Sequence, residues 1–405
     1  MSRVHGFRLV VYALAVLALA GCDWAQFGFG AANTSNNAFE PAITTASVAH
    51  LTVAWSQPCL CAGRSLVAGG VVYTLEATNT MTSIRAFDAQ QGTPKWSRVL
   101  TTDPSRTDTH LGAVANGLVY LIVGRSLLAL DAGTGSVKWV LQPPAPGTGT
   151  ITVQHLLVDG TLAFVDATAS IGPVSELSAV DPAGHITWSN TPGGEIGGFA
   201  GLKGHTLDVV SQMSTSQVLV TQYDEGGGFL QKQVVVNGGT TKVDPRGDVA
   251  ASGGLVYFHG PSFQGQGPAG AFFAVDPMTG ALAWSGFGNE QYAVSPSVVA
   301  AVGDGPHMPR TPAMVAMDAR SGRALWFVSG QLGTFRSGPT IANGVLFTTA
   351  GFNPVVLEAR DLTNGSLLGA FSIANDNLFG DVTPADGRVY VGSNQRLYAL
   401  APTSR

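Results

Sequence analysis

Short apolar runs recur along the chain, and each run ends at a turn signal. Leu127 to Leu130 precede Asp131, a glycine follows at Gly135, and Val137 and Trp139 then alternate with polar residues. An apolar run and a period-two alternation on either side of a tight turn predict two antiparallel strands joined as a hairpin. We therefore expect a chain built from many short strands.

The same hairpin pattern repeats as Ala-x-Asp, a glycine-containing turn and a Trp. Complete copies pair Asp88 with Trp96, Asp131 with Trp139, Asp181 with Trp188, Asp276 with Trp284 and Asp318 with Trp326. Two copies are degenerate, at Asp224 and at Asp361, and the latter has Gly369 at the Trp position. A repeat of about 40 to 50 residues with four short strands is typical of propeller blades.

A second hairpin belongs to each repeat. Its turns are Gly69-Gly70, Asn116-Gly117, Asp159-Gly160, Gly253-Gly254, Asn343-Gly344 and Asp386-Gly387, with weaker versions at Lys203-Gly204 and Gly303-Asp304. Both positions of such a turn tolerate positive φ, which suits Asn-Gly, Asp-Gly and Gly-Gly. The sequence thus contains eight inner hairpins.

The two ends of the chain supply the missing half of an eighth unit. Gln395 to Leu400 reads as the strand before a turn, and Leu51 to Trp55 reads as the Trp strand after one. Pairing them would close a ring and remove its exposed edges. We predict an all-β fold, an eight-bladed propeller over residues 51–402 with four-stranded antiparallel blades, closed by the N- and C-terminal strands.

The repeated Trp and Asp residues are expected to be structural. One Trp in each blade can bury its ring against a neighbouring blade while its N–H finds a partner. The Asp side chains most simply accept N–H groups of their own turns. Trp55, Trp96, Trp139, Trp188, Trp284 and Trp326, with Asp88, Asp131, Asp181, Asp276, Asp318 and Asp361, are therefore assigned to blade docking and not to catalysis.

The N-terminal residues read as an export signal. Arg3 and Arg8 precede an apolar stretch from Leu9 to Ala20 that is short for a membrane span. The sequence Leu19-Ala20-Gly21-Cys22 resembles the bacterial lipobox, which implies a signal peptide over 1–21, a lipid on Cys22 and a lead-in segment over 22–50. An ordinary signal peptide with a chance Cys is the alternative. We expect the protein to be held at the outer face of the cell membrane, on the periplasmic side where an outer membrane exists.

The charge and the cysteine content of the chain argue against a nucleic-acid partner and against a zinc site. The net charge is -5 and only 12% of residues are charged, so a nucleic-acid partner, which needs a basic face, is not expected. The remaining cysteines, Cys59 and Cys61, could form a disulfide or stay as two buried thiols. They are too few for a four-coordinate zinc site.

The repeats are similar to the tryptophan-docking repeats of the PQQ-like, quinoprotein-type β-propeller superfamily, over roughly residues 23 to 402. Asp23-Trp24-Ala25-Gln26-Phe27-Gly28 also resembles the segment that opens quinoprotein dehydrogenases. The resemblance implies one of two functions. One branch binds PQQ and Ca²⁺ and oxidises alcohols or sugars, while BamB-like propellers have no cofactor.

Departures from the enzyme pattern favour the second branch. Quinoprotein alcohol dehydrogenases place two adjacent cysteines beside PQQ, whereas Cys59 and Cys61 are differently spaced. Glu195, in a glycine-rich loop between blades, faintly resembles a Ca²⁺-ligating Glu of those enzymes. Asn289, Glu195, Arg336 and Asp381 are candidates for a binding face at blade-to-blade connections, and His110 and His155 are expected to be ordinary turn or strand residues.

From these observations we expect a non-catalytic, monomeric lipoprotein. It would have no metal and no cofactor, and it would serve as a scaffold for an envelope protein or a small ligand. The alternative is a PQQ- and Ca²⁺-dependent alcohol or sugar dehydrogenase.

Overall fold

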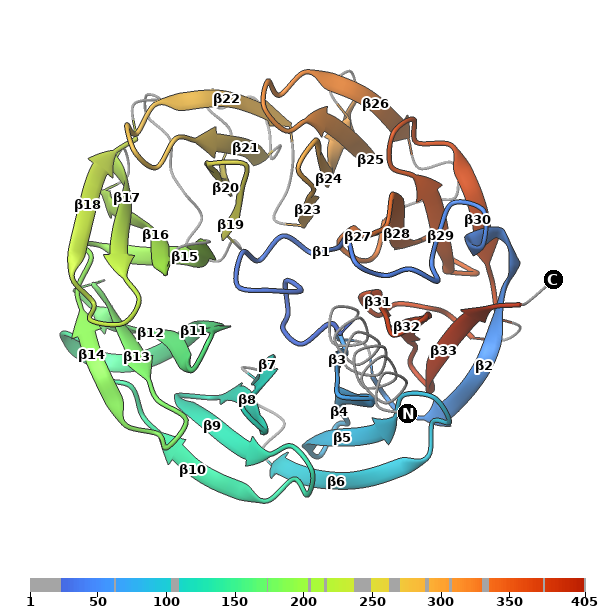
Figure 1. The fold of residues 1–405 in the computed structure, drawn as a ribbon, viewed down its shortest axis with the longest axis horizontal. Coiled ribbons are helices and arrows are strands. Elements are labelled where there is room, and N and C mark those ends of the chain that lie inside the picture. Colours follow the sequence, from blue (N-terminus) through green and yellow to red (C-terminus); the bar gives the residue numbers. More distant parts are fainter. Residues whose placement is uncertain are drawn as a thin grey trace, which may run out of the picture.

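The structure is a computed structural model, and it forms a ring of eight four-stranded antiparallel sheets around a central channel (Figure 1). It describes residues 23–61, 63–102, 109–172, 174–202, 205–214, 217–236, 249–261, 270–287, 291–305, 308–329, 335–373 and 376–403. The predicted eight-bladed, all-β fold is confirmed. Among these residues, no helix has the length and apolar character needed to cross a membrane.

Each blade places its first strand next to the channel and its last strand at the rim. Blade 1 comprises β3 (Leu66–Ala68), β4 (Val71–Ala77), β5 (Thr82–Asp88) and β6 (Pro94–Thr101), and blade 2 comprises β7 (Thr109–Ala115), β8 (Leu118–Val123), β9 (Ser126–Asp131) and β10 (Val137–Leu141). Blade 3 comprises β11 (Thr148–Asp159), β12 (Leu162–Ile171), β13 (Ser175–Val180) and β14 (Ile186–Asn190), and blade 4 comprises β15 (Glu195–Leu202), β16 (Thr206–Ser214), β17 (Gln217–Asp224) and β18 (Leu230–Val235).

The second half of the ring repeats this plan. Blade 5 comprises β19 (Val249–Ser252), β20 (Leu255–Pro261), β21 (Gly270–Val275) and β22 (Leu282–Phe287), and blade 6 comprises β23 (Tyr292–Val294), β24 (Val298–Gly305), β25 (Met308–Asp318) and β26 (Ala324–Ser329). Blade 7 comprises β27 (Thr340–Ala342), β28 (Val345–Ala350), β29 (Val356–Asp361) and β30 (Leu367–Phe371), and blade 8 comprises β31 (Thr383–Ala385), β32 (Arg388–Gly392), β33 (Arg396–Pro402) and β2 (Leu51–Pro58). A short 3-10 helix, η1 (Val48–His50), leads into β2, and β1 (Asn36–Asn37) pairs with β27.

The burial pattern explains why these residues form blades. Strands in the middle of a blade, such as β8, are buried on both faces because neighbouring blades pack on either side. Rim strands, such as β10, alternate between exposed and half-buried positions. The continuous apolar runs and the alternating segments in the sequence are these two kinds of strand.

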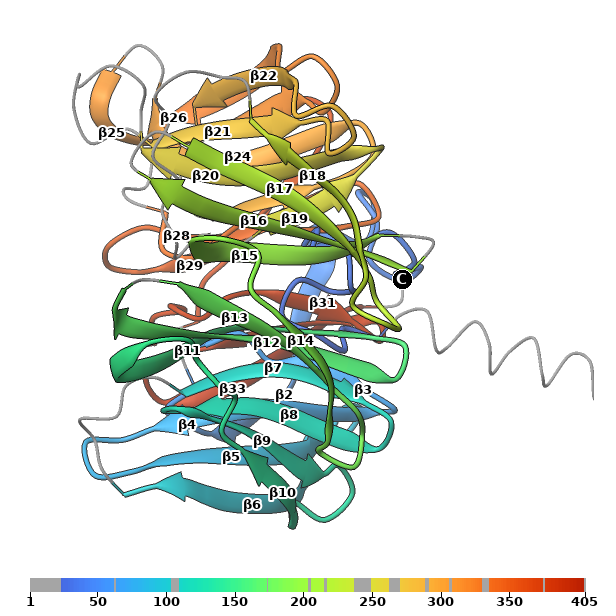
Figure 2. The ribbon, with the colours of Figure 1, turned by 90° about the vertical axis from the view of Figure 1, so that its left-hand side faces the viewer.

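The ring has two distinct faces. Because strands alternate in direction, the inner hairpins and the Asp-Gly hairpins lie on one face, here called the turn face. The hairpins between second and third strands and the blade-to-blade connections lie on the opposite, connection face (Figure 2). Asn116 and Gly117, like Asn343 and Gly344, have positive φ at both turn positions, as predicted for two-residue hairpins.

One predicted hairpin is wrong. Gly303 and Asp304 lie within β24, and the turn of blade 6 is formed by residues 295–297. The hydroxyl of Ser295 accepts a hydrogen bond from the N–H of Val298 at 2.9 Å. A serine side chain therefore stabilises this turn, whereas Gly or Asn residues form the corresponding turns of other blades.

The closure of the ring also explains the seventh repeat. The Trp of one blade docks on the Asp-Gly turn of the next, but blade 8 has no such turn because β33 and β2 come from opposite ends of the chain. Gly369 therefore faces no docking turn. A Cβ on Gly369 would lie 2.7 Å from the Phe371 ring and 3.5 Å from the Val48 carbonyl of η1. The missing Trp reflects the closure and not drift of the repeat.

Candidate functional site

The N-terminal residues 23–40, here called the plug, cross the centre of the ring (Figure 1). The plug makes at least one hydrogen bond to the innermost strand, or to the inner turn, of every blade. Its partners are Val67 in blade 1; Gly112 and Val114 in blade 2; Val158 in blade 3; Gly201 in blade 4; Val249 and Ala251 in blade 5; Val294 in blade 6; Ile341 and Asn343 in blade 7; and Pro384 and Gly387 in blade 8. Most of these partners lie near the ends of the innermost strands, so the plug closes the channel on the turn face.

Side chains hold the plug in register. Gln26 Nε2 donates to the Val158 carbonyl at 2.7 Å, and the Val158 N–H donates to Gln26 Oε1 at 2.9 Å. From the connection before β3, the buried Arg64 donates to the Phe27 carbonyl at 2.8 Å and to Ser35 Oγ at 3.1 Å. Its guanidinium also lies 4.6 Å from the centre of the Phe27 ring.

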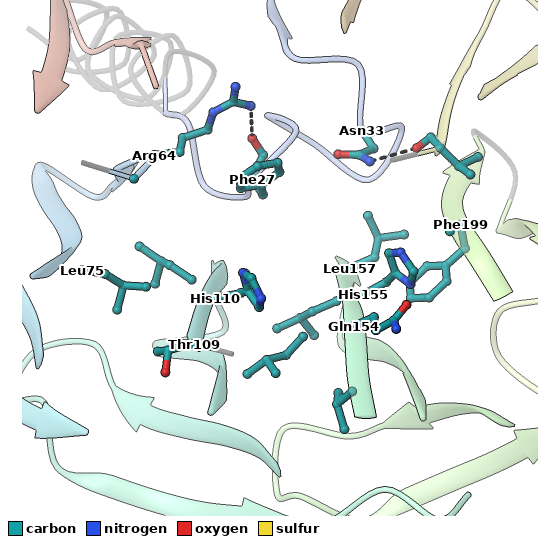
Figure 3. A pocket seen from close by; sticks show the side chains of 18 of the residues that line it. Phe27, Asn33, Arg64, Leu75, Thr109, His110, Gln154, His155, Leu157 and Phe199 are labelled. Atoms are coloured by element: carbon teal, nitrogen blue, oxygen red, sulfur yellow. Dashed lines mark hydrogen bonds between the residues drawn. The ribbon is translucent and has the colours of Figure 1, made fainter. Parts of the chain in front are cut away.

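A cavity of about 770 Å³ occupies the channel between the plug and the connection face. Phe27 and Asn33 of the plug form its floor, and blades 2, 3 and 4 supply most of its wall (Figure 3). Apolar and polar side chains line the wall in equal numbers, and the polar ones include Thr109, Gln154 and Arg64. A concave site that sets polar groups among apolar ones can bind a small molecule.

Three neighbouring innermost strands carry β-bulges at the cavity. The pairing register shifts between Leu111 and Ala113 in β7, between Val153 and Leu156 in β11, and between Ile196 and Gly198 in β15. Each strand has one more residue than its partner at that point. Bulges redirect the adjacent side chains, which here turns residues of β7 and β11 toward the channel.

The bulge in β11 is stabilised by a buried carboxylate. Asp166 of β12 is fully buried, and its Oδ1 accepts the backbone N–H of His155 at 2.8 Å and lies 3.2 Å from His155 Nδ1. The imidazole lines the cavity and packs edge-to-face on Phe199, with ring centres 5.9 Å apart. Asp166 thereby fixes the orientation of His155 in the cavity wall.

A second buried acid lies behind the plug. Glu225, in the turn after β17, is 5% exposed, and its Oε2 lies 3.4 Å from Nδ1 of His205. Burial first, and the neighbouring carboxylate of Asp159 second, raise the pKa of Glu225 to about 8. Gly201, which donates its N–H to Ala31 of the plug, lies between the two acids.

Of the sequence-predicted binding residues, Glu195, Arg336 and Asp381 lie at the connection face but do not form one site. Asp381 lines the cavity, with its Oδ2 4.0 Å from Arg64 Nε. Glu195 is the first residue of β15 and not part of a loop, as the sequence suggested, because it pairs with Gln212 of β16. It lines a side pocket of about 260 Å³. Arg336 is exposed over the Phe352 ring, and Asn289 lies outside the described residues.

The repeated Trp residues join successive blades. Their Nε1 atoms donate to the carbonyl of the residue after the Asp in the next blade: Trp55 to Ala89, Trp96 to Ala132, Trp139 to Pro182, Trp188 to Glu225, Trp284 to Ala319 and Trp326 to Leu362. The turn Asp carboxylates accept N–H groups of their own turns, as Asp88 does from Gln90 and Gln91. The Gln91 bond is the main cause of the lowered pKa of Asp88.

Cys59 and Cys61 are not among the residues that line the cavity. The sulfurs of Cys59 and Cys61 are within bonding distance as a disulfide, in the connection between β2 and β3. Cys22 lies outside the described residues. Among the residues described, no group of three or more His, Cys, Asp or Glu side chains could hold a metal ion.

The main parts of this site are not predicted by the sequence. His110 and His155 lie in strands, as expected, but both also line the cavity, and the sequence pattern does not identify Arg64 or Asp166. The available signal for Asp166 was a charged residue inside the apolar run of β12. A bulge, in contrast, leaves no mark in the hydrophobic pattern.

Comparisons with solved structures place the fold among known propellers. Quinohemoprotein alcohol dehydrogenase from Comamonas testosteroni matches with a TM-score of 0.74 at 15% identity, covering 96% of this chain and 82% of that one. A europium-containing methanol dehydrogenase matches at 0.68 and 14% identity, covering 96% and 100% of the two chains. BamB from Moraxella catarrhalis matches at 0.60 and 14% identity, covering 87% and 99%.

At the sequence level, no curated protein matches the chain. One family model does match, over residues 52–286, which is more than half of the chain, and its description is outer membrane protein assembly factor BamB. The chain therefore belongs to this family of PQQ-like β-propellers.

Proposed function

We propose that this protein is a non-catalytic, membrane-tethered binding propeller of the cell envelope. It holds its turn face toward the membrane and offers its connection face to a partner protein or ligand. The observation that carries the proposal is the position of the plug. Asp23, the residue next to the predicted lipidation site, accepts the N–H of Gly69 at 3.0 Å on the turn face.

Because of this contact, almost no flexible chain would separate the proposed lipid anchor from the turn face. Consecutive Cα atoms are about 3.8 Å apart, so a lipid on Cys22 would start within one residue of the turn face. A protein anchored in this way has its closed face against the bilayer, and the cavity then faces away from the membrane.

The connection face has features of a binding surface. Large apolar side chains are exposed on it, at Leu60 (42%), Ile171 (63%), Met213 (54%) and Phe352 (64%), while the turn face exposes Phe39, Phe229 and Met278 on the side that would meet the bilayer. Exposed apolar groups around a cavity are a common mark of an interaction site. The family description, an outer membrane protein assembly factor, supports a partner within the envelope.

A crosslinking experiment tests the proposal. A photocrosslinking residue at Met213 or Phe352 should capture an envelope protein in cells, whereas the same residue at Gln90 on the turn face should not. Cys22→Ser should release the protein from the membrane fraction. Equal capture from both faces, or an unchanged membrane fraction after Cys22→Ser, would contradict the proposal.

The second candidate is a PQQ- and Ca²⁺-dependent dehydrogenase, favoured by the similarity to alcohol dehydrogenase structures. Glu195 lies close to the cavity, since its side pocket shares Thr152 and Gln154 with it. However, the aromatic rings in the described cavity wall are those of Phe27, Phe199 and the two His residues, with no Trp and no adjacent Cys pair, and its single Arg is already bonded to the plug. We infer from these residues that the cavity fits PQQ poorly. Calorimetric titration of PQQ with Ca²⁺ decides the question, because tight stoichiometric binding would favour the enzyme.

A further inference from the structure

We propose that the channel cavity binds a neutral, hydroxyl-rich ligand of the class of a short oligosaccharide. The inference rests on the proposed binding function and specifies its ligand. Three observations carry it: the balance of charge in the cavity wall, the unpartnered polar atoms there, and the side pocket that extends the cavity.

The charged side chains at the cavity are neutralised within the protein. Arg64 and Asp381 are the only Arg, Lys, Asp or Glu residues in its described wall, and they lie 4.0 Å apart. The buried Asp166 behind the wall is bonded to His155. Within the main cavity an anionic ligand would therefore meet no uncompensated cation, and a cationic ligand no uncompensated carboxylate, so a neutral ligand is favoured there.

Polar atoms in the wall lack partners among the described residues. Thr109 Oγ1, Gln154 Oε1 and Arg64 Nε are buried and make no hydrogen bond there. Such atoms are costly unless something satisfies them. They comprise a donor, an acceptor and a hydroxyl that can do both, and ligand hydroxyl groups, which donate and accept, match this mixture.

The shape of the site favours an elongated ligand. Thr152 and Gln154 line both the 770 Å³ cavity and the 260 Å³ side pocket, so the two spaces are neighbours at these residues. Thr168, Ser170 and Glu195 add further oxygen atoms to the side pocket. The rings of Phe27 and Phe199 give the main cavity apolar surfaces for the carbon faces of a sugar (Figure 3).

Calorimetric titration of the full chain with neutral disaccharides tests the proposal, with cellobiose, maltose and N,N′-diacetylchitobiose as probes. We expect saturable binding of at least one of them. The affinity should not depend on salt concentration, because the ligand carries no charge. No oxidation of the sugar should accompany binding.

Matched variants locate the site. Gln154→Leu keeps the side-chain size but removes the amide, and should weaken binding about tenfold or more. Gln231→Leu is the control, because Gln231 is exposed on the rim strand β18. Equal weakening by both variants would overturn the proposal.

The remaining outcomes separate this inference from the proposed function. Binding of PQQ with Ca²⁺, but of no neutral sugar, would overturn the ligand class and favour the dehydrogenase. If neither binds while crosslinking from Met213 still captures a partner, the cavity proposal fails and the scaffold stands.

Discussion

The indole ring of Trp96 lies directly over Gly135 of the next blade. A Cβ built on Gly135 would be 2.5 Å from the ring, and the backbone there has a φ of +71°. Trp96 Nε1 meanwhile donates to the carbonyl of Ala132 in the same turn, at 2.9 Å. The glycine, its positive φ and the Trp of the preceding blade thus belong to one packing contact between two blades.

We expect Gly135→Ala to destabilise the fold by more than the strain of a left-handed residue. Gly117 in the same blade is a matched control, because its φ is +74° and nothing lies within 4 Å of a Cβ there. Gly117→Ala should cost roughly 1 kcal/mol from backbone strain. Gly135→Ala should cost about 1 to 3 kcal/mol more, because the ring must move. Urea unfolding measures both, and equal losses would show that the ring contact contributes nothing.

The contact between Gln26 and Val158 gives a test of the plug. Gln26→Glu keeps the acceptor for the Val158 N–H but loses the donor to its carbonyl. We expect a loss of about 1 to 3 kcal/mol in unfolding free energy. Amide exchange in β11 should also become faster. Gln231→Glu on the exposed rim is the control, and a similar loss there would argue against a specific role for the plug.

Gly112 allows the bulge in β7 to form. A Cβ on Gly112 would collide with Leu156 of the neighbouring blade, so Gly112→Ala should destabilise the protein by about 1 to 3 kcal/mol. Combining it with Leu156→Ala removes the colliding atoms. The double variant should then be more stable than the sum of the two single losses predicts. Strict additivity in thermal and urea unfolding would contradict the contact.

The buried Glu225 predicts a pH dependence of stability. Its pKa is raised from 4.5 to about 8, mainly by burial, so the folded state binds a proton that the unfolded state has already lost. The stabilisation is complete below pH 4.5, declines as the pH rises, and is lost once the pH passes about 8. Glu225→Gln cannot ionise and should flatten this decline. Melting temperatures of both proteins across that range provide the check, and parallel curves would contradict it.

The sequence was sufficient to predict the blades because their signals are local. The Asp-Gly turns, most of the Trp residues and the buried strands recur at intervals of about 40 to 50 residues, and the chain ends complement one another, as β2 and β33 do. The prediction of a turn at Gly303 and Asp304 was wrong because a Gly-Asp pair in a strand has the composition of a turn, whereas the actual turn depends on the side chain of Ser295.

The site was harder to predict because it depends on contacts between distant residues. The sequence predicts only a lead-in segment where the plug lies, because hydrogen bonds such as that from Asn37 to the Pro384 carbonyl join residues far apart in the chain. The cavity depends on bulges, and a bulge alters the direction of His155 without altering the pattern around it. Arg64 precedes β3 and is identified only by its contacts with Phe27 and Ser35.

The pairing of β2 with β33 has a consequence for the order of assembly. Seven blades are built from hairpins that can form soon after their own residues are synthesised. Blade 8 cannot form until β33 is complete, so β2 has no partner strand until β33 has been synthesised. Contacts between such distant residues form slowly, which makes ring closure the late step of folding. A chain shortened within β33 would keep seven formed blades and two open strand edges, ready to pair with other chains.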